Sequence, residues 1–176
     1  SRPDGVYYSS AAIGTSSHLT GELFAQATGA KLVHVPYKGT GFSLNALFTG
    51  EVQAAFLSTA TTSVQVKAGK LKALALLSEK RFSATPEIAT SVEQGYAGLE
   101  SYVWFGLYAP SRTPRAIVAK INRDVVAILR LPETRDTLLA QGFATAGSTP
   151  AEFTAYLRAE IARYAKIVKD AGIAAE

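Results

Sequence analysis

Tyr7–Leu19 reads YYSSAAIGTSSHL, and this stretch decides the fold. A short apolar strand, Val6 to Ser9, runs into a small polar loop that contains Gly14, and a helix then begins among hydroxyl-bearing residues. The first turn of a helix has unpaired backbone N–H groups and a partial positive charge, so this order of elements favours anion binding. The alternative is an ordinary strand-to-helix loop whose hydroxyls only cap the helix. Spacing alone leaves both interpretations open.

The same alternation of strand, polar loop and helix continues further along the chain. Strands are expected at residues 32–36, 52–57 and 71–77. One helix is expected between Thr40, as its cap, and Gly50, and another at residues 64–68. Glycine follows each expected helix, where it favours termination. Repeated strand–helix units predict an α/β fold with a mainly parallel sheet flanked by helices. Aromatic, β-prone residues at 102–108 predict one more strand, which crosses between two lobes.

The remainder of the chain is expected to be helical. Thr113 is placed to cap a helix with Pro114 at its first position, and Pro132 begins a second helix that stops at Gly142. A brief strand is expected at 143–146. Thr149-Pro150-Ala151-Glu152 has the spacing of a capping box, which predicts a last helix from Pro150 to about residue 171.

Composition narrows the class of protein. The 176 residues are 48% hydrophobic with a mean hydropathy of +0.12, which is typical of a packed globular chain. No apolar run approaches the roughly 20 residues that span a bilayer. The net charge of +4 is spread along the chain, unlike a nucleic-acid-binding stripe, so no nucleic-acid partner is expected. With no cysteine and only two histidines, neither a disulfide nor a metal site is expected, and no cofactor is predicted.

Two further polar loops repeat the geometry of the first. Tyr37–Gly41 supplies an aromatic ring and a lysine before a helix, and Ser58–Ser63 is rich in hydroxyls. Loops at the carboxyl ends of parallel strands line one crevice, where open α/β sheets bind their ligands. The candidate ligand-binding residues are Ser9, Ser10, Gly14, Thr15, Ser16, Ser17, His18, Tyr37, Lys38, Ser58 and Thr59.

A hydrolase that uses Ser16 or Ser17 with His18 is a rival interpretation. Adjacent helical residues do not face each other, and no carboxylate is placed to orient the imidazole. A structural role for His18, holding the loop by a side-chain hydrogen bond, is therefore expected. His34, on an expected strand, is interpreted as a satisfied core or edge histidine, and no catalytic residue is assigned.

Several segments together resemble one family. They are Tyr8-Ser9-Ser10 with Gly14–Leu19, His34–Gly39, Ala68–Ala75, Trp104–Pro110 with Thr113-Pro114, and Lys169–Ile173. In this order they are similar to the substrate-binding proteins of tripartite tricarboxylate transporters, also called Bug receptors. The resemblance covers essentially the whole chain, and Val35-Pro36-Tyr37-Lys38-Gly39 is its most specific piece.

The resemblance implies a periplasmic, two-lobed binding protein with a fold like that of type II periplasmic binding proteins. Such a receptor closes on a small organic carboxylate and delivers it to membrane transporter subunits. By the same resemblance, the loop from Ser9 to His18 meets the ligand carboxylate, Ser58 and Thr59 match a position that faces the cleft, and Tyr37 and Lys38 match the signature loop beside it. An effector domain of a LysR-type regulator is the alternative, because it shares this architecture.

The chain departs from the family in one respect. Only a few residues, beginning Ser1-Arg2-Pro3, precede the first strand, whereas family members have most of a first lobe there. The resemblance therefore implies that residues 1–101 form the second lobe and residues 102–176 the returning part of an incomplete first lobe. A fragment of this kind is expected to bind carboxylates weakly or not at all, and to self-associate through exposed apolar faces.

Overall fold

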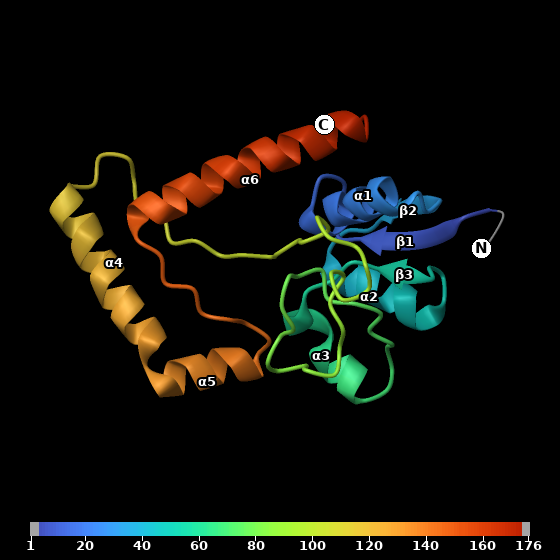
Figure 1. Cartoon of the computed structure of the whole chain (residues 1–176), viewed down its shortest axis with the longest axis horizontal. Coiled ribbons are helices and arrows are strands. Elements are labelled where there is room, and N and C mark those ends of the chain that lie inside the picture. The colour runs from blue at the N-terminus through green and yellow to red at the C-terminus, as the bar shows by residue number, and fades with distance from the viewer. Residues whose placement is uncertain (1–3, 174–176) are drawn as a thin grey trace. The chain divides into compact units, whose positions relative to one another are not determined.

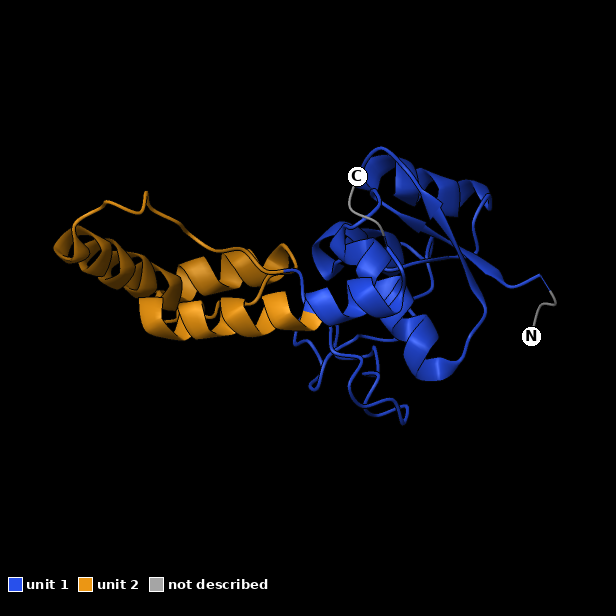
Figure 2. Cartoon of the chain, turned by 90° about the horizontal axis from the view of Figure 1, so that it is seen from above, with its two compact units in different colours: residues 1–103, 164–176 blue, residues 104–163 orange. Residues whose placement is uncertain are grey.

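The computed structural model describes residues 4–173. Residues 1–3, at the start of the expected second lobe, and residues 174–176, at the end of the expected first-lobe portion, lie outside the described residues. The chain divides into two compact units, which Figure 2 shows in two colours. Unit 1 comprises residues 1–103 with 164–176, and unit 2 comprises residues 104–163. The assignment of lobes stays a prediction.

Unit 1 contains a three-stranded parallel sheet, which confirms the expected fold class. Its strands are β1 (Val6–Ser10), β2 (Leu32–Pro36) and β3 (Ala54–Ala55), in the spatial order β2-β1-β3 (Figure 1). β1 is central, so Tyr8 pairs with His34 on one side and with Ala54 on the other.

Three helices follow the three strands in turn: α1 (Ser16–Thr28), α2 (Thr40–Thr49) and α3 (Thr59–Lys67). α1 and α2 end at Gly29 and Gly50, whose φ angles of 67° and 76° lie in the left-handed region that glycine adopts without steric cost. These two helix ends confirm the expectation from the sequence. α3 begins at Thr59, earlier than expected, so most of the hydroxyl-rich loop is in fact the start of this helix.

α1 and α2 cover opposite faces of the sheet, as the side chains of β1 show. The Tyr8 hydroxyl donates a hydrogen bond to Glu22 Oε1 in α1 (2.8 Å), whereas the hydroxyl of the next residue, Ser9, donates to the Ser43 carbonyl in α2 (3.1 Å). Successive side chains of a strand point to opposite faces, so the two helices lie on different sides of β1.

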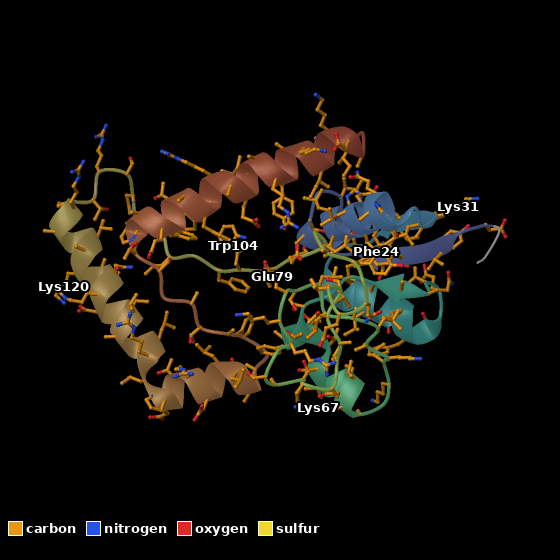
Figure 3. All side chains as sticks on the ribbon, in the orientation of Figure 1. Phe24, Lys31, Lys67, Glu79, Trp104 and Lys120 are labelled. Carbon is orange, nitrogen blue, oxygen red and sulfur yellow. The ribbon has the colours of Figure 1, made fainter. Side chains whose placement is uncertain are left out.

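The core of unit 1 is centred on the fully buried ring of Tyr8. α1 approaches this ring closely at Gly21, where an added Cβ would lie 2.3 Å from Tyr8 Cε2. Beside it, Phe24 of α1, labelled in Figure 3, packs on Phe56 with ring centroids 5.5 Å apart. Glycine is therefore required at position 21 by packing, although it is unfavourable inside a helix.

Unit 2 is helical, with α4 (Arg115–Arg130), α5 (Pro132–Ala140) and most of α6 (Pro150–Asp170). Trp104 makes edge-to-face contacts with Phe153 and Tyr156 of α6 (Figure 3). The capping box is confirmed, because the Thr149 N–H donates to Glu152 Oε2 (2.8 Å) and the Glu152 N–H donates to Thr149 Oγ1 (3.2 Å). α4 begins one residue later than expected, with Pro114 as its N-cap.

Three predicted strands are wrong. Residues 71–77 contribute only a single bridge, between Leu76 and Thr90, and residues 102–108 and 143–146 form no strand. β3 is also shorter than the predicted 52–57. A strand exists only where a neighbouring strand accepts and donates its backbone hydrogen bonds. Among the described residues, no strand pairs with 102–108 or 143–146. No helix in this described part of the chain is both long and apolar enough to cross a bilayer.

Candidate functional site

The carboxyl edge of the sheet is where the candidate residues meet. The chain passes from β1 to the neighbouring β2 and then returns across β1 to β3, so the strand order reverses between β1 and β3. In open α/β sheets a crevice forms outside the carboxyl ends of the strands at such a reversal, because the adjacent loops diverge to opposite faces. The β1–α1 loop and the start of α3 stand at this position (Figure 1).

Backbone hydrogen bonds join the β1–α1 loop to the β2–α2 loop. The Tyr37 N–H donates to the Ser10 carbonyl (3.0 Å), and the Gly39 N–H donates to the Ala11 carbonyl (2.8 Å). Two of the three polar loops predicted from the sequence are thus held against each other. The starts of α1 and α2 consequently lie next to the same edge of the sheet.

The first turns of α1, α2 and α3 share an electrostatic character. The N-cap residues Thr15, Gly39 and Ser58 make no side-chain capping hydrogen bond, and none of these first turns contains an acidic residue. α4 also lacks a cap, but no strand of the sheet leads into it. The partial positive charge of each helix start is therefore not neutralised by the helix itself. Three such starts along one sheet edge favour a negatively charged ligand.

The exposed part of the β1–α1 loop is its second half. Thr15 turns its hydroxyl back to the Ala12 carbonyl (2.6 Å), which leaves the first turn of α1 uncapped. In the part of the chain that the structure describes, the N–H groups of Ser16, Ser17 and His18 donate no hydrogen bond to a backbone carbonyl. Ser16 is exposed, whereas the Ser17 hydroxyl is buried and accepts a hydrogen bond from the Ala11 N–H (3.1 Å). Any anion held here would meet backbone amides before most of the hydroxyls.

Ser9 and Ser10 are both fully buried, and their hydroxyls serve the interior. Ser9 bonds to Ser43, and Ser10 donates to the Ala12 carbonyl (3.0 Å) while its oxygen lies 2.6 Å from His34 Nε2. The structure therefore places these two predicted residues behind the site, where they fix the carboxyl end of β1.

His18 holds the loop, as the sequence led us to expect. Its Nδ1 accepts the Gly14 N–H (3.0 Å), and its ring stacks on His34 with centroids 3.7 Å apart and an angle of 8° between the planes. Burial lowers the pKa of His18, against the opposing effect of Glu22. Burial, and next the neighbouring His18, lower the pKa of His34 to about 4. Both imidazoles are consequently neutral at physiological pH.

The other predicted residues are less closely gathered. Lys38 is exposed in the β2–α2 loop. Desolvation, and next the Glu51 carboxylate, raise the pKa of Tyr37, which indicates that its hydroxyl lies toward the far end of α2. Ser58 and Thr59 stand at the start of α3, where the Ser58 hydroxyl lies 2.9 Å from that of Thr61. Lys38, Ser58 and Thr59 remain candidates, and Tyr37 is the least favourably placed of the set.

Sequence inspection missed Glu22 and Ser43. Glu22 Oε1 accepts the Tyr8 hydroxyl and lies 3.7 Å from His18 Nε2. Burial, and next Glu22, raise the pKa of Tyr8. The only sequence signal for Glu22 was its position one helical turn after His18.

A hollow of about 310 Å³ adjoins the side chains of His18, Glu22 and His34. Its lining consists of Ile13, His18, Glu22, His34, Ala171, Gly172 and Ile173. No group of three or more histidine or acidic side chains in the described residues could hold a metal ion.

Known proteins share both the sequence and the fold. A family model described as "Tripartite tricarboxylate transporter family receptor" matches residues 1–173. Protein BugT of Bordetella pertussis is 32% identical over 171 residues, which are 97% of this chain and 52% of BugT. The solved structure "R. palustris Rpa4515 with adipate" is 34% identical with a TM-score of 0.88 and covers 98% of this chain. The periplasmic binding protein BugD is 31% identical with a TM-score of 0.78 and covers 96% of it.

This chain covers only part of the length of each of those proteins. The chain spans about half of BugT, 58% of the Rpa4515 chain and 57% of the BugD chain. The chain is thus truncated relative to these proteins, and the expectation of an incomplete two-lobed fold agrees with this coverage.

Proposed function

The chain belongs to the family of tripartite tricarboxylate transporter receptors, and on that premise we propose that the intact protein is an extracytoplasmic receptor for a small organic carboxylate. Residues 1–101 are its second lobe in this proposal, and residues 102–176 return through the first lobe. The family match favours this function over a LysR-type effector domain and over a serine hydrolase.

One observation carries the proposal: three uncapped helix starts without acidic residues follow the three strands at the edge where the sheet order reverses. A carboxylate there would accept hydrogen bonds from the backbone N–H groups of Ser16, Ser17 and His18. Adipate in the related Rpa4515 supports a carboxylate as the class of ligand. The binding group in this proposal is the helix start, with Gly14 and Thr15 shaping the loop, Lys38 adding charge, and Ser58 and Thr59 approaching from α3.

The energies indicate that this half of the receptor cannot bind tightly by itself. A helix N-terminus stabilises a nearby anion by about 0.3–1 kcal/mol, and by up to ~2 kcal/mol when partly buried. Three such helix starts give at most ~6 kcal/mol, whereas a micromolar Kd corresponds to about 8 kcal/mol. We infer that the remaining contacts come from the opposing lobe, which encloses the ligand and excludes water.

Delivery to membrane transporter subunits and a periplasmic location follow in this proposal from the family and from the periplasmic binding protein BugD. The ligand-bound receptor would present itself to the membrane subunits after closure of the two lobes.

Calorimetry with adipate tests the proposal. The chain alone is compared with a chimaera in which the part of Rpa4515 that precedes the matched region is joined to residue 1. The chimaera is expected to bind adipate with a micromolar Kd and to ignore the neutral adipamide, while the chain alone binds at least a hundredfold more weakly. Equal and tight binding by both proteins would contradict the need for a second lobe, and no binding by a folded chimaera would contradict the function.

Substitution of Ser16, which is exposed, tests the site itself. An aspartate in the first turn of a helix stabilises that helix, yet here it would repel a carboxylate. Ser16→Asp in the chimaera is therefore expected to raise stability while it weakens adipate binding tenfold or more, and the neutral Ser16→Asn is the matched control. Unchanged adipate affinity in Ser16→Asp would place the ligand elsewhere.

A further inference from the structure

A closed network of contacts lies behind the β1–α1 loop, and carboxylate binding alone does not require it. Gly14 donates its N–H to His18 Nδ1, His18 stacks on His34, and His34 Nε2 meets the hydroxyl of Ser10. Ser10 is the last residue of β1, and Gly14 lies in the short loop that follows it. The two imidazoles therefore connect the strand residue that precedes this loop with the glycine at which the loop turns.

We propose that His18, supported by His34, is the positioning residue of the β1–α1 loop, and that its neutral imidazole is required to hold the loop in the arrangement that receives the ligand. The inference deepens the proposed function and rests on it for the link to ligand binding. The connection through the two imidazoles is a property of the loop and is testable without a ligand.

The hydrogen bond from Gly14 determines where the hydrogen of the neutral His18 ring is. His18 Nδ1 accepts the Gly14 N–H, so its single hydrogen is on Nε2, which lies 3.7 Å from Glu22 Oε1. Ser10 has one hydroxyl hydrogen, and when it is donated to the Ala12 carbonyl the Ser10 oxygen accepts from His34 Nε2–H. Every contact in the network is satisfied when both rings are neutral.

Protonation of His18 breaks the network at one atom. A hydrogen added to Nδ1 turns this acceptor into a donor, which then faces the Gly14 N–H, and two donors cannot bond to each other. Gly14 has a φ of 74°. Glycine adopts positive and negative φ values with similar ease, so the backbone at Gly14 offers little resistance to rearrangement. The uncapped first turn of α1 begins only two residues later. Loss of this bond thus releases the Gly14 N–H next to the residues that the ligand would contact, while the Thr15 hydroxyl stays bonded to the Ala12 carbonyl.

The surroundings of the pair determine which ring is protonated first. From α1, Glu22 faces His18; from β1, the Tyr8 hydroxyl donates to Glu22; and from β2 comes His34 itself. The end of α6 contributes Ala171–Ile173 to the adjoining hollow, and none of these side chains titrates. Glu22 favours a charge on both rings and burial disfavours it on both, whereas a charge on His18 disfavours a second one on the stacked His34. As the pH falls, the first proton therefore goes to His18, and the two rings titrate as a coupled pair.

A purely structural histidine would also pack in this place, but it would not make Gly14 respond to pH. NMR of the ¹⁵N-labelled full chain separates the two roles. At pH 7.5 we expect a scalar coupling across the hydrogen bond between Gly14 N and His18 Nδ1. On acidification this coupling should disappear and the Gly14 amide should shift, with the same midpoint as the protonation of His18, below pH 6.5. Absence of the coupling at pH 7.5, or a Gly14 signal that stays constant while His18 is protonated, overturns the inference.

Two variants assign the effect to one ring. His34→Phe keeps a flat ring on His18 without a titratable group, and the pH response of Gly14 is expected to persist. His18→Phe is expected to abolish that response and to raise the pKa of His34, because the neighbouring charge is removed. An equal Gly14 response in His18→Phe overturns the proposal, and if this variant does not fold, the coupling in the wild-type chain decides alone.

The link to the ligand is tested with adipate at pH 7.5 in the chimaera described above. His18→Phe is expected to weaken binding tenfold or more, whereas His34→Phe retains most of it. Equal adipate affinity in the wild type and His18→Phe overturns the inference and leaves the proposed function intact. If neither protein binds adipate, the proposed function fails and the ligand part of the inference fails with it, while the NMR result still decides whether His18 holds the loop.

Discussion

Gly21→Ala should destabilise unit 1, although alanine is the better helix former. The new Cβ would lie 2.3 Å from Cε2, 2.4 Å from Cζ and 2.7 Å from the hydroxyl oxygen of Tyr8. The Tyr8 ring is fully buried, so it cannot move aside into solvent. Overpacking of this kind costs about 1–3 kcal/mol, and a strained hydroxyl bond to Glu22 adds ~1 kcal/mol. Alanine returns about 1 kcal/mol of helix propensity, so the net loss is about 1–3 kcal/mol.

Gly41→Ala is the matched control. Gly41 also lies within a helix, α2, but no atom lies within 4 Å of its added Cβ and its φ is not in the left-handed region. The same substitution there is expected to stabilise the chain by a few tenths to about 1 kcal/mol. One chemical change thus has opposite signs at two helical positions.

Native-state hydrogen exchange followed by mass spectrometry is the appropriate assay. Trp104, the single tryptophan, belongs to unit 2, so its fluorescence does not report on unit 1. Peptides from β1 and α1 should exchange roughly five- to 150-fold faster in Gly21→Ala, and slightly slower or unchanged in Gly41→Ala. Equal or greater protection of β1 in Gly21→Ala would refute the packing of α1 on Tyr8.

Four further predictions concern unit 2. Gly106→Ala would place a Cβ 2.2 Å from Phe153 Cζ, so a shift in Trp104 fluorescence and a lower unfolding midpoint are expected, and an unchanged spectrum would contradict this contact. Thr149→Ala removes the capping box and should cost about 1 kcal/mol, measured by denaturation. Hydrogen bonds from Thr149 lower the pKa of the Glu152 carboxyl. The stability that this cap contributes is therefore complete above the ordinary carboxyl pKa and is lost as the pH falls through the lowered value. Helicity of α6 that did not decrease in acid would count against this cap. Exposed apolar side chains, Phe105 among them at 79% exposure, predict self-association in sedimentation experiments, whereas a clean monomer at high concentration would argue against it.

Local sequence signals predicted the first half of the sheet well. β2 matches its expected bounds, and β1 extends only one residue further. α2 begins one residue earlier than expected, with Gly39 in place of Thr40 as its N-cap, and both early helices end at glycine as predicted. These features depend on near neighbours in sequence: alternating apolar residues, a left-handed glycine and a cap. The capping box at Thr149 belongs to the same group.

The failures concern features that depend on a distant partner. Residues 71–77 and 102–108 have the composition of strands, but composition does not show whether another strand lies alongside. For 102–108 no such strand occurs among the described residues, and the chain spans only about half of relatives such as BugT. The early start of α3 was hidden by its run of threonines, which disfavour helix interiors.

The candidate site was predictable as a location and less so in its detail. The polar loop at Ser9–His18 indicated the correct sheet edge, yet the sequence did not show that Ser9 and Ser10 point to opposite faces and are buried. The pairing of His18 with His34 depends on the parallel register of β1 and β2, which no local pattern specifies. Loop chemistry can be recognised from residue types, whereas the orientation of each side chain requires the fold.

Amide chemical shifts of this chain during titration with adipate report directly on carboxylate binding at the helix starts, since NMR detects binding in the millimolar range. We expect the backbone signals of Ser16, Ser17 and His18 to move first, followed by those at the starts of α2 and α3, and adipamide to leave all of them unchanged. Shifts confined to other surfaces, or identical shifts with the neutral amide, would contradict the binding of a carboxylate at these helix starts.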